Sequence, residues 1–244
     1  MKCGLVSSWF RLLLIQASWS YDRMIGVGVA FASEPLLRDL PGGVQGQQYR
    51  QAVARAAKYF NGHPYLIGLA VGALARTEHE GVPPEQMGRL RSALTGPLGS
   101  IGDKMVWAGT LPSASAVGLL LAVMVSPIVG VVGFLVLHNT VNVGLRIWAL
   151  SAGWRGGMQV AKFLGGKTIK LWLKLAGPMA AFAVGLVLPL VGAWLTRGLD
   201  ARALLGVGII AAVGILFARS VWPTLGGLRF ALGGVVLAAL AGWL

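Results

Sequence analysis

The sequence predicts an all-α integral membrane protein. We expect amphipathic and re-entrant helices in the N-terminal half and about four transmembrane helices in the C-terminal half. Of the 244 residues, 56% are hydrophobic and only 12% are charged, whereas soluble domains carry about a quarter charged residues. A soluble fold would lack the polar surface that water requires. The 36 glycines agree, because glycine lets membrane helices pack closely.

Charge and cysteine content exclude several classes of protein. The formal net charge is +13, but the basic residues are spread out or flank apolar runs, without the interleaved aromatics of a nucleic-acid groove. They suit membrane topology and anionic lipid instead. Cys3 is the single cysteine, so no disulfide framework is expected. His63, His79 and His138 lack metal-ligand spacing, and we predict no metal site.

The N-terminal half mixes charged and apolar residues at helical spacing. Leu5–Tyr21, Gln47–Phe60 and Pro84–Leu94 are expected to form helices that lie along the membrane interface or pack on a partner. A small soluble helical domain is the alternative. Between them, Pro64–Ala75 is apolar but too short for the roughly 20 residues of a spanning helix. We therefore expect it to be re-entrant or buried in protein.

The sequence of the C-terminal half predicts spanning helices on both sides of one basic connection. Ser113–Leu137 is long enough to span, and Pro127 predicts a kink within it. Arg146–Lys174 carries six basic residues and no acidic one, which predicts a cytoplasmic connection. Three further apolar runs follow: Leu175–Leu195, Leu204–Phe217 and Leu228–Leu244.

Polar groups gather at both ends of the short apolar run. Asn61 and His63 precede it, and Pro64 disfavours helical geometry for the residue before it. Glu78, one of only eight acidic residues, follows it directly. We predict that Asn61 contacts a ligand and that His63 holds the turn as a satisfied buried donor.

A second polar site is predicted in Leu94–Pro112. Three residues there predict turns of the backbone: Gly96, Pro97 and Gly102. Irregular backbone at membrane depth requires burial in protein or a cavity. Asp103 and Trp107 follow, and an isolated acidic residue in such a place is a functional candidate. The alternative is an extramembrane loop in which Asp103 caps a helix.

These side chains are of the types that bind sugars. Carboxylates and amides hydrogen-bond ring hydroxyls, and an aromatic face covers the apolar side of the ring. The candidates are Asn61, His63, Glu78, Asp103 and Trp107. Their spacing alone does not establish that they converge.

Five segments resemble one known family, the IID component of mannose/fructose/sorbose-type phosphotransferase system (PTS) sugar permeases. They agree with its motifs in order and spacing: IQASWSYDRMIGVG (15–28), YFNGHPY (59–65), GALARTEHE (72–80), LTGPLGSIGDKMVWAGTLP (94–112) and HNTVNVGLRIWALSAGWRGG (138–157). The resemblance covers roughly residues 9–160. It adds Gln16, in the first motif, to the candidate core residues.

The resemblance implies a phosphoenolpyruvate-dependent sugar permease of the bacterial cytoplasmic membrane. A IID chain pairs with the membrane component IIC, and the heterodimers assemble as trimers. Sugar crosses in a shared core and is phosphorylated by cytoplasmic IIB, which IIA supplies with phosphate. This chain would thus be no enzyme and need no cofactor. We expect a transport core over residues 1–174 and transmembrane helices over 175–244.

Several family positions carry different residues, and each change removes a polar or charged group from the expected pattern: Ser20, Ile25, Gly62, His79 and Leu111. A non-transporting membrane scaffold or regulatory subunit derived from the family is therefore the main alternative. A membrane enzyme built on Glu78, His79 and Asp103 is a third hypothesis.

Overall fold

A computed structural model describes residues 2–198, 200–203, 205, 206, 208, 209 and 213. The chain divides into two compact units, Met1–Val191 and Gly192–Leu244. The division expected after residue 174 falls inside a helix and does not coincide with this boundary. The apolar run Leu204–Phe217 lies mostly outside the described residues, and the run Leu228–Leu244 lies wholly outside them.

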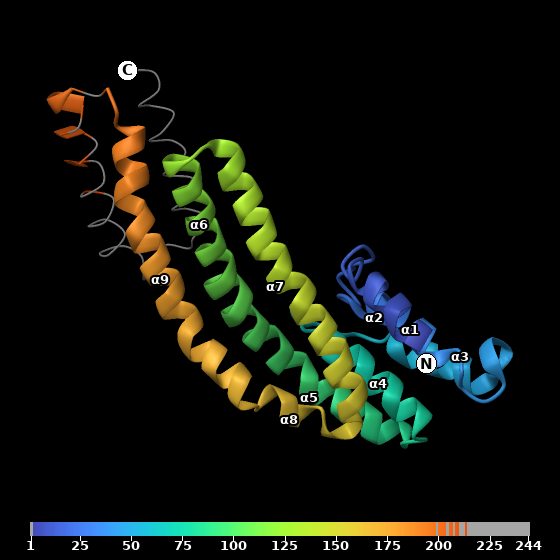
Figure 1. The fold of residues 1–244 in the computed structure, drawn as a ribbon. Helices are drawn as coiled ribbons and strands as arrows, with labels where there is room; N and C mark the ends of the chain where they lie inside the picture. Colours follow the sequence, from blue (N-terminus) through green and yellow to red (C-terminus); the bar gives the residue numbers. More distant parts are fainter. Residues whose placement is uncertain (1, 199, 204, 207, 210–212, 214–244) are drawn as a thin grey trace. The chain divides into compact units, whose positions relative to one another are not determined.

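The described part is all-helical, as predicted (Figure 1). Its nine α-helices are α1 (Lys2–Leu12), α2 (Gly26–Leu37), α3 (Gln47–Ala56), α4 (Gly68–His79), α5 (Pro84–Gly102), α6 (Leu111–Met124), α7 (Pro127–Gly156), α8 (Ala161–Leu164) and α9 (Lys167–Leu195). A π-helical segment, η2 (Asp103–Thr110), joins α5 to α6. Short 3-10 helices occupy Gly43–Gln45 and Gly157–Gln159.

The N-terminal helices pack around α4 and the C-terminal half of α7. Helices α1, α2 and α4 share one apolar core with α7, and α4 is buried along most of its length. The prediction that Pro64–Ala75 is buried in protein is therefore confirmed. Helix α1 is shorter than predicted and ends at Leu12, whose carbonyl accepts hydrogen bonds from Ile15 and from the Arg146 guanidinium.

Close packing between α4 and α7 depends on glycine. A Cβ at Gly72 would lie 2.5 Å from the Leu150 carbonyl oxygen and from the Trp154 amide nitrogen. A Cβ at Gly153 would overlap the Leu69 carbonyl oxygen. Small residues at such crossings let two membrane helices bring their backbones together. The crossing therefore fixes α4 against α7.

The predicted broken segment, Leu94–Pro112, is continuous helix, which corrects the expectation of turns at Gly96, Pro97 and Gly102. All three lie within α5, and helix runs without a gap from Pro84 to Met124. Glycine and proline are tolerated within membrane helices because an open backbone in lipid would leave its polar groups unsatisfied. The irregularity appears instead as the π-helical segment η2, which inserts wider turns.

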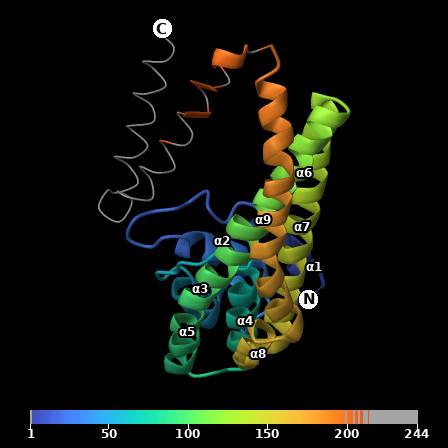
Figure 2. The same ribbon diagram turned by 90° about the vertical axis from the view of Figure 1, so that its left-hand side faces the viewer.

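The predicted single span Ser113–Leu137 is wrong, because the chain reverses within it. Helix α6 ends at Met124, and α7 begins at Pro127 and packs beside it (Figure 2). The Ser126 side chain caps α7 by accepting from the Val129 amide at 3.3 Å. Pro127 is thus the first residue of a helix, where its missing N–H costs nothing.

The basic connection is shorter than predicted. Helix α7 extends to Gly156 and α9 begins at Lys167, so only residues 157–166 lie between them. Arg146 belongs to α7 and is buried, which removes it from the connection. The cytoplasmic side of this connection remains a prediction.

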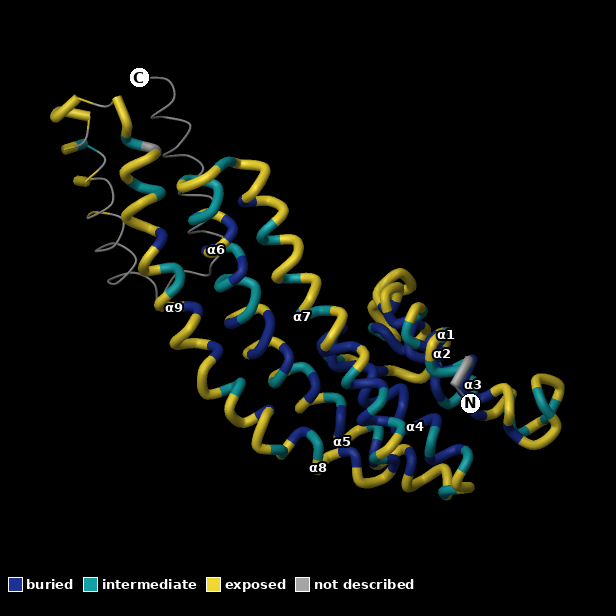
Figure 3. Tube along the Cα trace, viewed as in Figure 1, coloured by how far each residue is buried: buried dark blue, intermediate teal, exposed yellow. Residues whose placement is uncertain are grey.

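Among the residues that the structure describes, three segments are long and apolar enough to span a membrane: Pro84–Met124, Pro127–Gln159 and Lys167–Trp194. Their outer residues are exposed although apolar, as Figure 3 shows for α6, α7 and α9. Ile128, for example, is 76% exposed. Apolar surface on this scale is stable in lipid and not in water. The described part is therefore that of a membrane protein.

Candidate functional site

The loop before α4 is held in place by backbone hydrogen bonds on both sides. The Ile25 amide donates to the Phe60 carbonyl at 3.1 Å, and the Phe60 amide donates to the Arg23 carbonyl at 3.3 Å. On the other side, the His63 amide donates to the Leu98 carbonyl of α5 at 3.4 Å. Asn61 lies between these anchors and is exposed. Its backbone is fixed while its amide side chain stays available.

His63 is packed against α5 and η2. Its side chain is 2% exposed, and it fills the space that a Cβ at Gly102 would need. Its ring centroid lies 5.0 Å from that of Tyr65 and 5.1 Å from that of Trp107. Gly102 therefore serves close packing against His63 and not the turn that the sequence predicted.

The hydrogen bonds of His63 are only half satisfied, contrary to the prediction. Its Nδ1 accepts from the Tyr65 amide at 3.2 Å, so the ring proton belongs on Nε2. That Nε2 is buried and has no hydrogen-bond partner among the described residues. Burial, together with the nearby Arg146 charge, lowers the pKa of His63 to about 4. His63 is thus neutral at physiological pH.

Two predicted residues lie in η2, which follows the Gly102 that packs against this histidine. Asp103 follows Gly102 directly and is exposed, and its carboxylate makes no hydrogen bond within the described residues. Trp107 lies four residues later in the same π-helical segment and is 45% exposed. Residues at this spacing lie near one another on a helix surface. The Trp107 ring therefore packs beside His63, and an unpaired carboxylate lies in the same π-helical segment.

The polar and aromatic side chains around His63, here called the His63 cluster, extend into α7. Three residues there were not singled out from the sequence. The Tyr65 hydroxyl lies 3.2 Å from His138 Nε2, and the Arg146 guanidinium lies 4.8 Å from the Tyr65 ring centroid. Arg146 also donates to Asn142 Oδ1 at 2.7 Å. His138, Asn142 and Arg146 recur every fourth residue in an apolar helix. That spacing marks one polar helix face and could have identified them.

Two predicted residues do not join the cluster. Glu78 lies in the last turn of α4, about 15 Å along the helix from its start, and pairs with Arg55 at 2.6 and 2.8 Å. Gln16 is exposed in the turn after α1, and its side chain makes no hydrogen bond within the described residues. The structure therefore places Asn61, His63, Asp103 and Trp107 on two neighbouring segments, the loop before α4 and η2, and leaves these two apart.

The low pKa of His63 predicts a pH dependence of stability. His63 lies outside the three candidate spans, and its ordinary pKa of 6.5 falls to about 4 on folding. The unfolded chain therefore binds more protons between these values. Stability should be full above about pH 6.5 and fall by roughly 1.4 kcal/mol per pH unit towards pH 4.

Unfolding in detergent at several pH values between 7.5 and 4.5 measures this slope. His63→Phe should reduce it by about one proton's worth, whereas His79→Gln should retain it. An unchanged slope in His63→Phe would show that other groups are responsible.

These features define a helical membrane protein with a polar and aromatic site at the start of a short buried helix. π-helical segments within α-helices frequently lie at functional sites. Comparison with known proteins identifies the class further.

The model of the PTS mannose/fructose/sorbose family IID component matches residues 2–195. The chain belongs to this family. It is a permease subunit and not the phosphotransfer enzyme, which confirms the resemblance seen in the sequence.

Curated relatives include the fructose permease IID component of Bacillus subtilis, 26% identical over 80% of this chain and 70% of the relative. The mannose-specific EIID component of Escherichia coli K12 is 26% identical over 76% and 66%. The sorbose-specific EIID component of Klebsiella pneumoniae is 28% identical over 79% and 70%. The matches thus span about two thirds of these relatives' length.

Two solved structures share the fold. A structure described only as a membrane protein has a TM-score of 0.74 at 21% identity, covering 100% of this chain and 96% of the other. A chain of the mannose transporter ManYZ in complex with microcin E492 has a TM-score of 0.61 at 19% identity, with the same coverage.

Proposed function

We propose that this IID subunit acts with a IIC partner to move a hexose or related sugar across the bacterial cytoplasmic membrane. IIB then phosphorylates the sugar on the cytoplasmic side, after IIA has supplied the phosphoryl group. The family model carries this proposal, because its match contains every residue of the His63 cluster. The relatives are named for fructose, mannose and sorbose, and these names favour a hexose as the substrate.

The exposed groups around His63 support a sugar-contact role. The Asn61 amide and the Asp103 carboxylate are unpaired in the described part, and both bond well to ring hydroxyls. Trp107 offers an apolar face beside them. The role of His63, Tyr65 and Gly102 would be to hold this surface in shape, and direct contact with the sugar would come from the exposed groups.

Asn61→Ala and Asp103→Asn test this role. Each variant should reduce uptake of labelled sugar by at least about tenfold, because a lost sugar hydrogen bond costs on the order of 1.5 kcal/mol or more. Both should still co-purify with IIC. Ser100→Ala, an exposed change in α5, is the control and should transport normally. Full uptake in both site variants would refute the assignment.

The scaffold alternative makes a different prediction. The departures from the family pattern at Gly62 and His79 motivate it. His79 is now engaged with the Leu36 carbonyl, with Nε2 and oxygen 2.7 Å apart. A scaffold would form a stable pair with IIC yet move none of the tested sugars. Genes for IIA and IIB beside its own would favour transport.

A further inference from the structure

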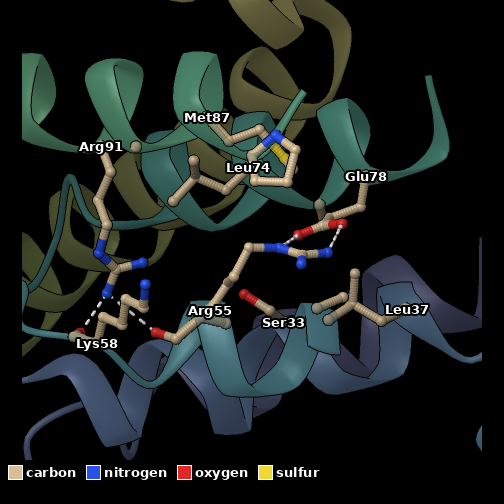
Figure 4. Close-up of a pocket in the computed structure, with 13 residues that line it drawn as sticks. Ser33, Leu37, Arg55, Lys58, Leu74, Glu78, Met87 and Arg91 are labelled. Atoms are coloured by element: carbon tan, nitrogen blue, oxygen red, sulfur yellow. Dashed lines mark hydrogen bonds and ion pairs between the residues drawn. The ribbon is translucent and has the colours of Figure 1, made fainter. Parts of the chain in front are cut away.

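A second pocket lies at the far end of α4 from His63. Four helices contribute to it: α2 supplies Ser33, α3 supplies Arg55, α4 supplies Glu78 and α5 supplies Arg91 (Figure 4). Lys58, just after α3, completes the polar lining. Its volume is about 60 Å³, which holds roughly four to six waters at about 10–15 Å³ each.

The pocket carries an excess of positive charge. Arg55, Lys58 and Arg91 face one carboxylate, that of Glu78. Glu78 accepts two hydrogen bonds from Arg55, through Nε and Nη2, at 2.8 and 2.6 Å. The carboxylate is thus committed to one guanidinium. The remaining two cations have no acidic partner among the described residues.

Donors remain free on each of the basic groups. Arg91 directs Nε and Nη2 to the carbonyls of Tyr59, Ala56 and Lys58, at 3.0 Å for the first two. Its Nη1, like Arg55 Nη1, has no partner in the described part. Lys58 Nζ is also without a partner there. Three N–H donors, one on each of Arg55, Lys58 and Arg91, are therefore available to a ligand.

Ser33 supplies the observation that points most directly to a ligand. It is 2% exposed and lines the pocket, and its Oγ is buried without a hydrogen-bond partner in the described residues. Figure 4 shows its hydroxyl directed toward the side chain of Arg55. A buried hydroxyl without a partner costs about 1–3 kcal/mol. A ligand acceptor in the pocket would remove that cost.

We propose that this pocket binds one phosphate-sized oxyanion. Compact tetrahedral oxyanions accept hydrogen bonds on every side, which matches three cationic donors and a hydroxyl in a space of a few waters. The oxyanion is either free phosphate or the headgroup of a phosphate-monoester lipid. This site is separate from the His63 cluster and does not depend on the proposed transport.

Thermal unfolding of the purified chain tests the proposal in two arms. The first adds inorganic phosphate to protein in a neutral detergent, with chloride at equal ionic strength as reference. The second compares nanodiscs of phosphatidylcholine with and without phosphatidic acid. A ligand that binds only the folded state raises the unfolding temperature. A rise in the first arm identifies free phosphate, and a rise in the second alone identifies the lipid headgroup.

Variants separate a site from general charge attraction. Lys58→Met should weaken the binding that is observed by about tenfold, as loss of a charge-assisted hydrogen bond does. Lys104→Met removes an exposed lysine outside the pocket and should change nothing. Ser33→Ala should leave stability without ligand unchanged or higher, yet weaken binding several-fold. No rise in either arm, or equal effects of Lys58→Met and Lys104→Met, would overturn the proposal.

Discussion

Gly153→Leu is expected to prevent stable packing of α4 against α7. A Cβ alone would overlap the Leu69 carbonyl oxygen, and backbone cannot move aside as a side chain can. Overpacking of this kind costs about 3 kcal/mol or more. Because α4 carries the loop that holds Asn61 and His63, the candidate site should be lost with the packing. Titration with a denaturing detergent measures the change.

The same helix offers a matched control. A Cβ at Gly144, nine residues earlier in α7, would meet no atom within 4 Å. Gly144→Ala should therefore stabilise α7 by about 0.5–1 kcal/mol, since alanine is the better helix former. Opposite signs for Gly153→Ala and Gly144→Ala are the expected result. Equal effects would mean that helix propensity, and not the α4–α7 crossing, determines both.

Glu78→Gln is expected to destabilise the fold and to affect transport only through that loss. The carboxylate side chain is about one-tenth exposed and pairs with Arg55 through two hydrogen bonds. Removing its charge leaves a partly buried guanidinium without a counter-charge, at a cost of about 3–5 kcal/mol for a fully buried pair and less here. Uptake per folded molecule should stay near the wild-type value.

Glu80→Gln is the control for this prediction. Glu80 pairs with Arg76 at 2.7 Å in an exposed i, i+4 arrangement, two residues from Glu78. Exposed pairs of this kind contribute about 0.3–0.5 kcal/mol. Similar losses of stability in the two variants would contradict a structural role for the Glu78 pair. Loss of uptake in fully folded Glu78→Gln would restore Glu78 to the sugar site.

Sequence reasoning identified the class of protein and proposed candidate residues for its site. Hydropathy identified the membrane, and the length of Pro64–Ala75 identified a buried segment. Polar and aromatic groups are rare in an apolar chain, and this made Asn61, His63, Asp103 and Trp107 candidates. Glu78 was misplaced because residue type does not reveal a partner: Arg55 lies 23 positions earlier in the sequence and meets it only after folding.

Helix boundaries were harder to predict, for physical reasons. Gly96 and Pro97 favour a break of the helix in water but are tolerated within a helix in lipid. Unsatisfied backbone hydrogen-bonding groups in lipid cost more free energy than a distorted helix does. Pro127 fits both a kink and a helix start, and the cap from Ser126 determines which one forms. The polar face of His138, Asn142 and Arg146 was present in the spacing but was not recognised, because only Arg146 was considered, as part of the basic connection.

The central claim is that sugar binds around Asn61, Asp103 and Trp107 in a core shared with IIC. Equilibrium binding of labelled mannose, fructose and sorbose to the co-purified pair, and to each chain alone, tests it most directly. We expect that only the pair, and neither single chain, binds one of these hexoses. The pair carrying Asn61→Ala should lose that binding. Undiminished binding by the Asn61→Ala pair, or equal binding by IIC alone, would contradict the account.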